Sequence, residues 1–155
     1  MHQQTAIKKQ HMQKISEELG HFLADTYALY LKTQNFHWNV TGPLFYTLHK
    51  MFEEQYIELA SAVDEIAERI RSLGGHTPAS FSQFSQLTSL KEEKEKVEAT
   101  KMVEKLLNDH ETLAQHAAHL IATAQTAGDE GTADLLIQRL KVHEKFTWML
   151  RSSLR

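Results

Sequence analysis

The sequence contains no cysteine and only two prolines and six glycines among its 155 residues. Without cysteine the chain can form no disulfide, no thiolate metal site and no thiol nucleophile. No stretch approaches the roughly 18 uninterrupted apolar residues of a membrane-spanning helix, and the first residues contain no signal-peptide core. The net charge of -3 gives no general attraction to nucleic acid. We therefore expect a cytosolic protein with a single domain, residues 1–155.

Apolar residues recur at helical spacing in four segments of the chain. The predicted helices cover roughly residues 5–34, 41–74, 103–124 and 132–150. The second of them begins at the N-cap Thr41 and ends at the stop at Gly74. Residues 1–14 are expected to be a mobile tail where the first helix does not include them. Short connections join the first two helices and the last two, which predicts two antiparallel hairpins.

The connection between the hairpins is much longer, GGHTPASFSQFSQLTSLKEEKEK. Within it Phe81, Phe84 and Leu87 have the spacing of a short helix. Two hairpins joined by one long crossover define the ferritin-like variant of the four-helix bundle. The predicted fold is therefore all-α, a ferritin-like four-helix bundle with a short extra helix in the crossover.

The second helix carries a polar stripe about 120° away from its apolar face, at 100° per residue. The stripe consists of His49, Glu53, Asp64 and Glu68. A solvated helix face would explain it. As a metal site it cannot close within one chain, because Glu53 and Asp64 are about 16 Å apart along the helix axis. Two antiparallel copies, with a two-fold axis between residues 58 and 59, would place His49 opposite Glu68 and Glu53 opposite Asp64.

His37 precedes the Thr-Gly-Pro break between the first two helices. An antiparallel return at that break predicts that His37 lies beside His49. Each site would then combine two imidazoles from one chain with carboxylates from the other. Such a donor set suits iron and also zinc or manganese.

Four stretches make the resemblance to a known family specific: NFHWNVTGPLFYTLHKMFEE followed by VDEIAERIRSLGG, and TADLL and WML in the last helix. Over essentially its whole length the chain resembles the Dps family of mini-ferritins, DNA-binding proteins from starved cells. The resemblance implies a ferroxidase centre at a two-fold dimer interface and twelve subunits assembled as a hollow shell. It also implies oxidation of Fe(II), preferably by hydrogen peroxide, and storage of ferric mineral that protects the bacterial cell and its DNA.

The resemblance assigns roles to individual residues. Glu53 matches a carboxylate that assists the second metal position, and Trp38 and Trp148 match tryptophans thought to absorb oxidising equivalents, although ordinary packing would also explain them. The ligand positions are matched by His37, His49, Asp64 and Glu68. Asp134 matches an acid of a three-fold pore, with Asp129 and Glu130 as neighbours, although acids are also common in the first turn of a helix.

The remaining histidines receive no metal role. His110 falls on the apolar stripe of the third helix, which is typical of a hydrogen-bonded core histidine. No spacing assigns a partner to His2, His11, His21, His76, His116, His119 or His143.

Some members of the family bind DNA through a lysine-rich tail. Here Lys8, Lys9 and Lys14 precede the first acid, and Arg151 and Arg155 lie near the other end. DNA is thus a possible partner, although the tail is short. The alternative function is a DNA-coating nucleoid protein in which metal oxidation is secondary. A metal-free or zinc-occupied structural oligomer is a third interpretation.

Overall fold

The computed structural model describes residues 7–155, and within that range it contains five helices and no strand. They are α1 (Lys9–Asn39), α2 (Phe45–Ser72), α3 (Phe81–Leu87), α4 (Ala99–Thr126) and α5 (Glu130–Ser152). The predicted all-α, ferritin-like architecture is confirmed. None of the helices in residues 7–155 is long and apolar enough to cross a membrane.

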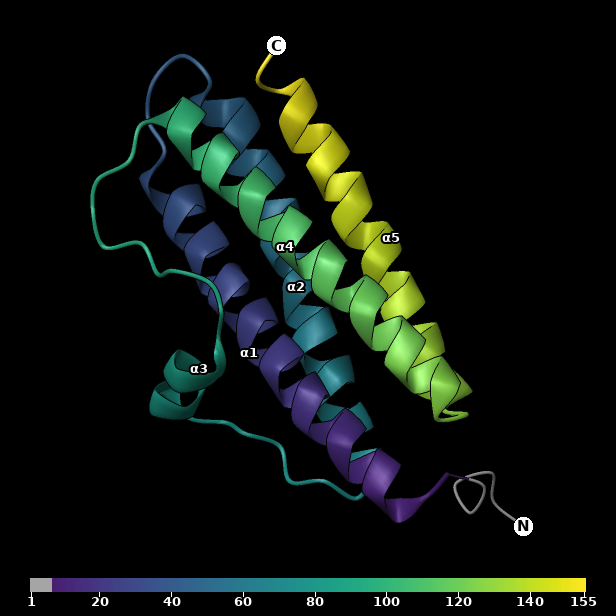
Figure 1. Ribbon diagram of the computed structural model, residues 1–155. Helices are drawn as coiled ribbons and strands as arrows, with labels where there is room; N and C mark the ends of the chain where they lie inside the picture. The colour runs from purple at the N-terminus through teal and green to yellow at the C-terminus, as the bar shows by residue number, and fades with distance from the viewer. Residues whose placement is uncertain (1–6) are drawn as a thin grey trace.

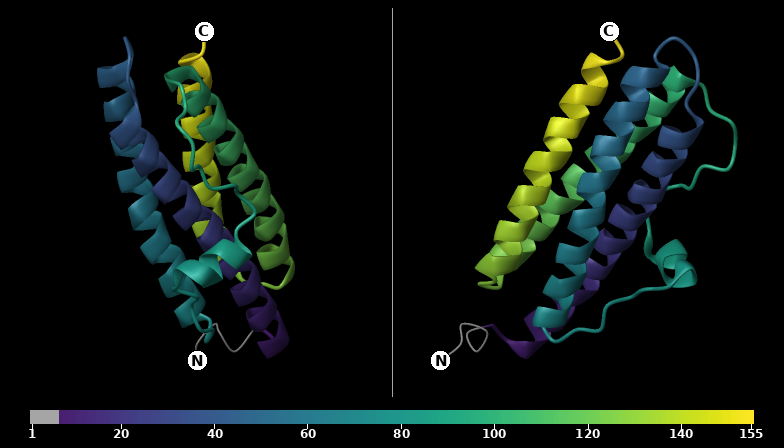
Figure 2. Two further views of the ribbon diagram at one scale, coloured as in Figure 1. Left: turned by 90° about the vertical axis from the view of Figure 1, so that its left-hand side faces the viewer. Right: turned by 180° about the vertical axis from the view of Figure 1, so that it is seen from behind.

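The four long helices form two antiparallel hairpins, α1 with α2 and α4 with α5, packed against each other (Figure 1). The crossover runs along the outside of α1 and carries α3 there (Figure 2). It returns the chain to the end of the bundle where α1 turns into α2, so α4 runs in the same direction as α2. Apolar residues of all four long helices meet in one core, including Phe22, Phe52, Leu106 and Leu136.

The turn between α1 and α2 differs in detail from the prediction. Thr41 is not the N-cap of α2, because Leu44 holds that position and no side chain caps the helix. Gly42 has φ 102°, which glycine adopts without strain, and its carbonyl accepts a 3.0 Å hydrogen bond from the Phe45 N–H. Pro43 therefore occupies the second position of a β-turn rather than the first turn of a helix.

The first helix is also displaced from its predicted range. It begins at Lys9, so residues 9–14 are helical, while Thr5 lies outside the described residues. It continues to Asn39 rather than stopping near Gln34, which places His37 in its last turn.

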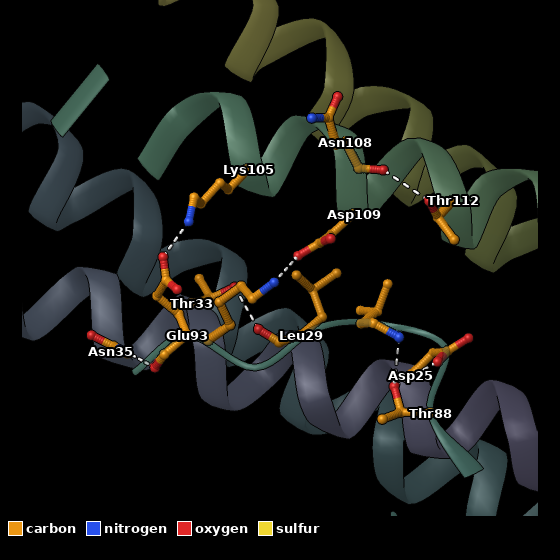
Figure 3. Close-up of polar contacts among 12 residues, drawn as sticks. Asp25, Leu29, Thr33, Asn35, Thr88, Glu93, Lys105, Asn108, Asp109 and Thr112 are labelled. Atoms are coloured by element: carbon orange, nitrogen blue, oxygen red, sulfur yellow. Dashed lines mark hydrogen bonds and ion pairs between the residues drawn. The ribbon is translucent and has the colours of Figure 1, made fainter. Parts of the chain in front are cut away.

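Buried polar contacts fix the crossover to the bundle (Figure 3). The Asp25 carboxylate of α1 accepts hydrogen bonds from the Thr88 hydroxyl and the Ser89 N–H, both at 2.7 Å. It also lies 3.1 Å from Nδ1 of His116 on α4. One carboxylate thus joins α1, the crossover and α4, and His116 has the acidic partner that the sequence did not reveal.

The start of α5 is fixed by a second buried carboxylate. The Asp129 side chain, 1% exposed, accepts a 3.0 Å hydrogen bond from the Thr132 N–H as the N-cap of α5. The carboxylate also accepts a 2.5 Å hydrogen bond from the Thr132 hydroxyl and forms a 2.8 Å ion pair with Arg69 of α2. The helix therefore begins at Glu130 rather than near Thr132, with its cap bonded to the neighbouring hairpin.

We expect Asp129→Ala to lower the free energy of unfolding by about 2 kcal/mol, because N-cap replacement alone costs up to about that amount and Arg69 loses its carboxylate partner, keeping only the Thr132 hydroxyl. Urea unfolding measures the effect. Glu130→Ala is the matched control, since Glu130 is exposed and lies one residue further on. Equal effects of the two substitutions would contradict a capping role for Asp129.

Candidate metal centre

Two imidazoles from neighbouring helices stack face to face at the α1–α2 turn. His37 in the last turn of α1 and His49 in the second turn of α2 have ring centroids 3.9 Å apart and planes inclined by 12°. The Nδ1 of His37 donates to the His49 carbonyl, and the Nδ1 of His49 donates to the His37 carbonyl, both at 2.7 Å. The turn therefore places the two histidines together, as the antiparallel return predicts.

The reciprocal hydrogen bonds determine the tautomer of both rings. A carbonyl oxygen only accepts, so each Nδ1 carries the proton. In the neutral imidazole this leaves Nε2 with a free lone pair, which is the form that binds a metal ion. The pair thus presents two oriented nitrogen ligands.

Aromatic and acidic side chains surround the pair. Phe45 stacks on His49 at 4.9 Å, and the Tyr56 ring meets His37 edge to face at 5.2 Å. Glu53 Oε2 lies 3.8 Å from the His37 Nε2. The side chain of His37 is 7% exposed and that of Glu53 is 36% exposed, so the carboxylate borders solvent. Nitrogen and oxygen donors therefore converge beside His37.

The other two predicted ligands lie further along α2. Asp64 and Glu68 are both exposed and turn toward solvent. In residues 7–155 no group of three or more histidine and acidic side chains is close enough to hold a metal ion. A single chain places His49 and Glu53 each beside His37 but does not gather three donors around one point, and it leaves Asp64 and Glu68 apart from them, as the helix geometry requires for one copy.

The remaining predicted residues take different positions. Trp38 and Trp148 are 61% and 63% exposed. Glu130 and Asp134, which were predicted near a pore, are exposed near the start of α5. Asp129 does not fit that role, because its carboxylate is buried and bonded to Arg69 and Thr132.

A second histidine pair, not predicted from the sequence, lies in the core. The Nδ1 atoms of His110 on α4 and His143 on α5 are 2.8 Å apart, and both side chains are fully buried. Arg139 binds Glu58 of α2 through two nitrogens, and its Nη2 lies 3.4 Å from the His143 Nε2. His110 is thus a hydrogen-bonded core histidine, as predicted. The helical spacing of Leu136, Arg139 and His143 was the signal that could have revealed its partner.

Burial and positive charge keep this pair neutral. Burial lowers the pKa of His110 from its ordinary value of 6.5 to about 3, and the Arg139 charge acts in the same direction. The pKa of His143 is lowered well below 6.5 by burial, by His110 and by Arg139. A metal ion here would have to displace the hydrogen bond between the rings beside a guanidinium, so the pair near the turn is the better candidate centre.

The helical architecture is that of the ferritin-like class, and residues 16–155 match the family model described as "Ferritin-like domain". The chain is 40% identical over 141 residues to "DNA protection during starvation protein 2" of Bacillus anthracis, covering 91% of this chain and 97% of the relative. It is similar to the crystal structure of a Dps protein from Bacillus brevis, with a TM-score of 0.92 and 37% identity, covering 96% and 100% of the two chains.

A further similar structure is the Dps protein of Vibrio cholerae, described as a member of a broad superfamily of ferritin-like diiron-carboxylate proteins. It has a TM-score of 0.93 and 31% identity, and the match covers 96% of this chain and 94% of that one. The chain belongs to the Dps family of ferritin-like proteins.

Proposed function

We propose that this protein oxidises Fe(II) with hydrogen peroxide at sites shared by two chains and stores the ferric product in a hollow dodecamer. The observation that carries the proposal is the pair of stacked imidazoles with both Nε2 atoms left free by reciprocal hydrogen bonds. Iron is the substrate, and zinc or manganese could occupy the same donors.

The second half of each site is proposed to come from a partner chain. The stripe of α2 that carries Asp64 and Glu68 also presents Ile57, 55% exposed, and the small residues Ala60 and Ser61, both exposed. Small side chains permit close approach of two helices. A two-fold axis between residues 58 and 59 would set Asp64 and Glu68 of each chain against His49 and Glu53 of the other.

The chemistry follows from the charges of the donors. Carboxylates attract and hold Fe(II), and neutral imidazoles bind it without adding positive charge. Hydrogen peroxide takes one electron from each of two Fe(II) ions and also takes up two protons. The products are two Fe(III) ions and two water molecules. Because both electrons reach the peroxide at the same site, less hydroxyl radical is released than in the reaction of peroxide with free Fe(II). Glu130 and Asp134 would attract cations to a pore between chains.

The alternative, a DNA coat, receives less support from the residues of the N-terminal segment. Lys9 and Lys14 belong to α1 and so do not extend on a free tail. We expect no retardation of DNA by the protein in a gel-shift assay at low salt and mildly acidic pH, where phosphate contacts are strongest. Retardation there would favour the DNA-coating alternative.

The test of the proposed function combines anaerobic Fe(II) with the assembled protein and adds peroxide. We expect a rapid rise in ferric absorbance, with less hydroxyl radical captured by a spin trap than from the same Fe(II) without protein. Light scattering on the same sample reports the assembly. Oxidation no faster than that of free Fe(II), with no lowering of the radical yield, would overturn the proposal.

A further inference from the structure

A continuous row of aromatic rings leads away from the histidine pair. The Tyr56 ring meets His37 at 5.2 Å and Tyr30 at 6.0 Å between centroids. Tyr30 in turn meets Tyr27, which lies three residues earlier on α1, at 5.7 Å between centroids. All three contacts are edge to face, with planes inclined by 66° to 69°, and their separations are those of rings in direct contact.

The outer end of the row reaches a surface groove. Tyr27 stacks on Phe84 of α3 at 4.9 Å and lines a groove of about 1080 Å³ between α1, α3 and the crossover. The same groove is bordered by three glutamates and three lysines, Glu92, Glu93, Glu95, Lys32, Lys94 and Lys96. The row therefore connects the candidate centre with a second place that solvent reaches.

Packing alone does not require phenols at these positions, since phenylalanine would fill the same space. Only Tyr30 has a side-chain hydrogen bond among the three tyrosines within residues 7–155, accepted from Gln34 Nε2 at 3.1 Å. The Tyr56 hydroxyl is thus not engaged by another side chain of the described chain. Tyrosine differs from phenylalanine in being able to lose an electron and a proton together.

We propose that Tyr56, Tyr30 and Tyr27 conduct single electrons from the groove to the histidine pair when peroxide is reduced there with only one Fe(II) ion present. The inference rests on the proposed function. The O–O bond of peroxide breaks on receiving one electron from Fe(II) and one from Tyr56. The Tyr56 hydroxyl proton and one proton from solvent complete the two water molecules.

The electron deficit then moves outward. Tyr30 returns an electron and a proton to Tyr56, and Tyr27 does the same for Tyr30. A second Fe(II) ion arriving from solvent reduces the Tyr27 radical at the groove and becomes Fe(III), while a solvent proton restores the hydroxyl. The sum is two Fe(II), one peroxide and two protons converted to two Fe(III) and two waters, the same balance as at a fully loaded site.

The test uses the assembled protein with less Fe(II) than sites, mixed with peroxide and frozen rapidly for electron paramagnetic resonance. We expect the signal of a tyrosyl radical, which should become narrower when the protein carries ring-deuterated tyrosine. The signal should be absent in Tyr56→Phe. Tyr46→Phe is the matched control, because Tyr46 is 71% exposed and outside the row. In Tyr27→Phe the radical should decay more slowly after further Fe(II) is added.

The outcomes separate this inference from the proposed function. An unchanged radical signal in Tyr56→Phe would overturn the tyrosine path. So would a signal that does not narrow with deuterated tyrosine and that disappears in Trp38→Phe. Normal Fe(II) oxidation without any tyrosyl radical would also overturn it and leave the proposed function standing. Absence of catalysed Fe(II) oxidation would overturn both.

Discussion

Mixing two inactive variants, His49→Ala and Asp64→Asn, is expected to restore about a quarter of the wild-type rate of Fe(II) oxidation when subunits exchange at random across a two-fold interface. Alone, each variant should be slowed by at least 10- to 100-fold, since losing even a supporting partner of a metal ligand costs about that much. The assembly should persist in Asp64→Asn, because Asp64 is exposed.

The recovery follows from the division of ligands between chains. In a mixed dimer one site receives both substituted residues. The other site receives His49 from the Asp64→Asn chain and Asp64 from the His49→Ala chain, so it is intact. Half of the dimers are mixed and one of their two sites is whole, which gives about a quarter of all sites. A site within one chain would show no recovery, because every chain carries one of the substitutions.

The measurement is the initial rate of ferric absorbance after the variants are dissociated together and reassembled. A matched control is Glu65→Gln, since Glu65 is exposed and adjacent to Asp64 but is not a predicted ligand. Its rate should equal that of the unsubstituted protein. Unchanged kinetics in both His49→Ala and Asp64→Asn would show that the iron chemistry occurs elsewhere.

Acidification below pH 6.5 is expected to destabilise the chain through the buried pair His110 and His143. Their pKa values in the folded chain are below 6.5, so the unfolded chain binds more protons between pH 6.5 and about 3. The stabilisation is fully present above pH 6.5 and is lost as the pH falls. Two histidines together give a slope that approaches about 2.7 kcal/mol per pH unit, or about 3 kcal/mol between pH 6.5 and 5, because each unfolded imidazole is only half protonated at pH 6.5.

The geometry explains why neither ring accepts a proton. Arg139 only donates, so the His143 Nε2 next to it is the acceptor, and the Nδ1 proton of His143 points to the His110 Nδ1. The space between the two Nδ1 atoms, 2.8 Å, holds one proton and not two. The unpartnered Nε2 of His110 then carries the proton of that ring.

Urea unfolding at fixed protein concentration between pH 6.5 and 5 measures the slope while most carboxylates remain ionised. We expect the double substitution His110→Leu and His143→Leu to flatten the slope, and His119→Gln, which removes an exposed histidine, to leave it unchanged. The same slope in the double variant and the unsubstituted chain would exclude the buried pair as the origin of acid sensitivity.

The sequence predicted the parts of the site that depend on local geometry. Helical periodicity and a tight turn are enough to bring His37 beside His49, and both are visible in the order of residues. The same periodicity shows that Asp64 cannot reach that pair within one helix. The facing of the two rings and their reciprocal hydrogen bonds could not be predicted, because they depend on where α1 ends, and helix ends are set by small differences in capping.

Contacts between distant segments were the part that the sequence did not reveal. Asp25, Thr88 and His116 meet only because the crossover lies along α1, and nothing in their spacing records that path. Asp129 was expected near a pore because of the family resemblance, yet the ion pair with Arg69 turns it inward. The pair of His110 and His143 required the relative rotation of α4 and α5, which periodicity limits but does not determine.

The exchange of hydrogen bonds between His37 and His49 means that half of the proposed site is in its working geometry as soon as one subunit has folded. Neither ring has to lose rotational freedom when iron arrives, so the binding energy of the metal is not spent on ordering them. A lone subunit nevertheless lacks the carboxylates of a partner and would hold Fe(II) weakly. Under the proposed function, iron oxidation would therefore begin only after a partner chain is in place, and a free subunit would not generate the insoluble product.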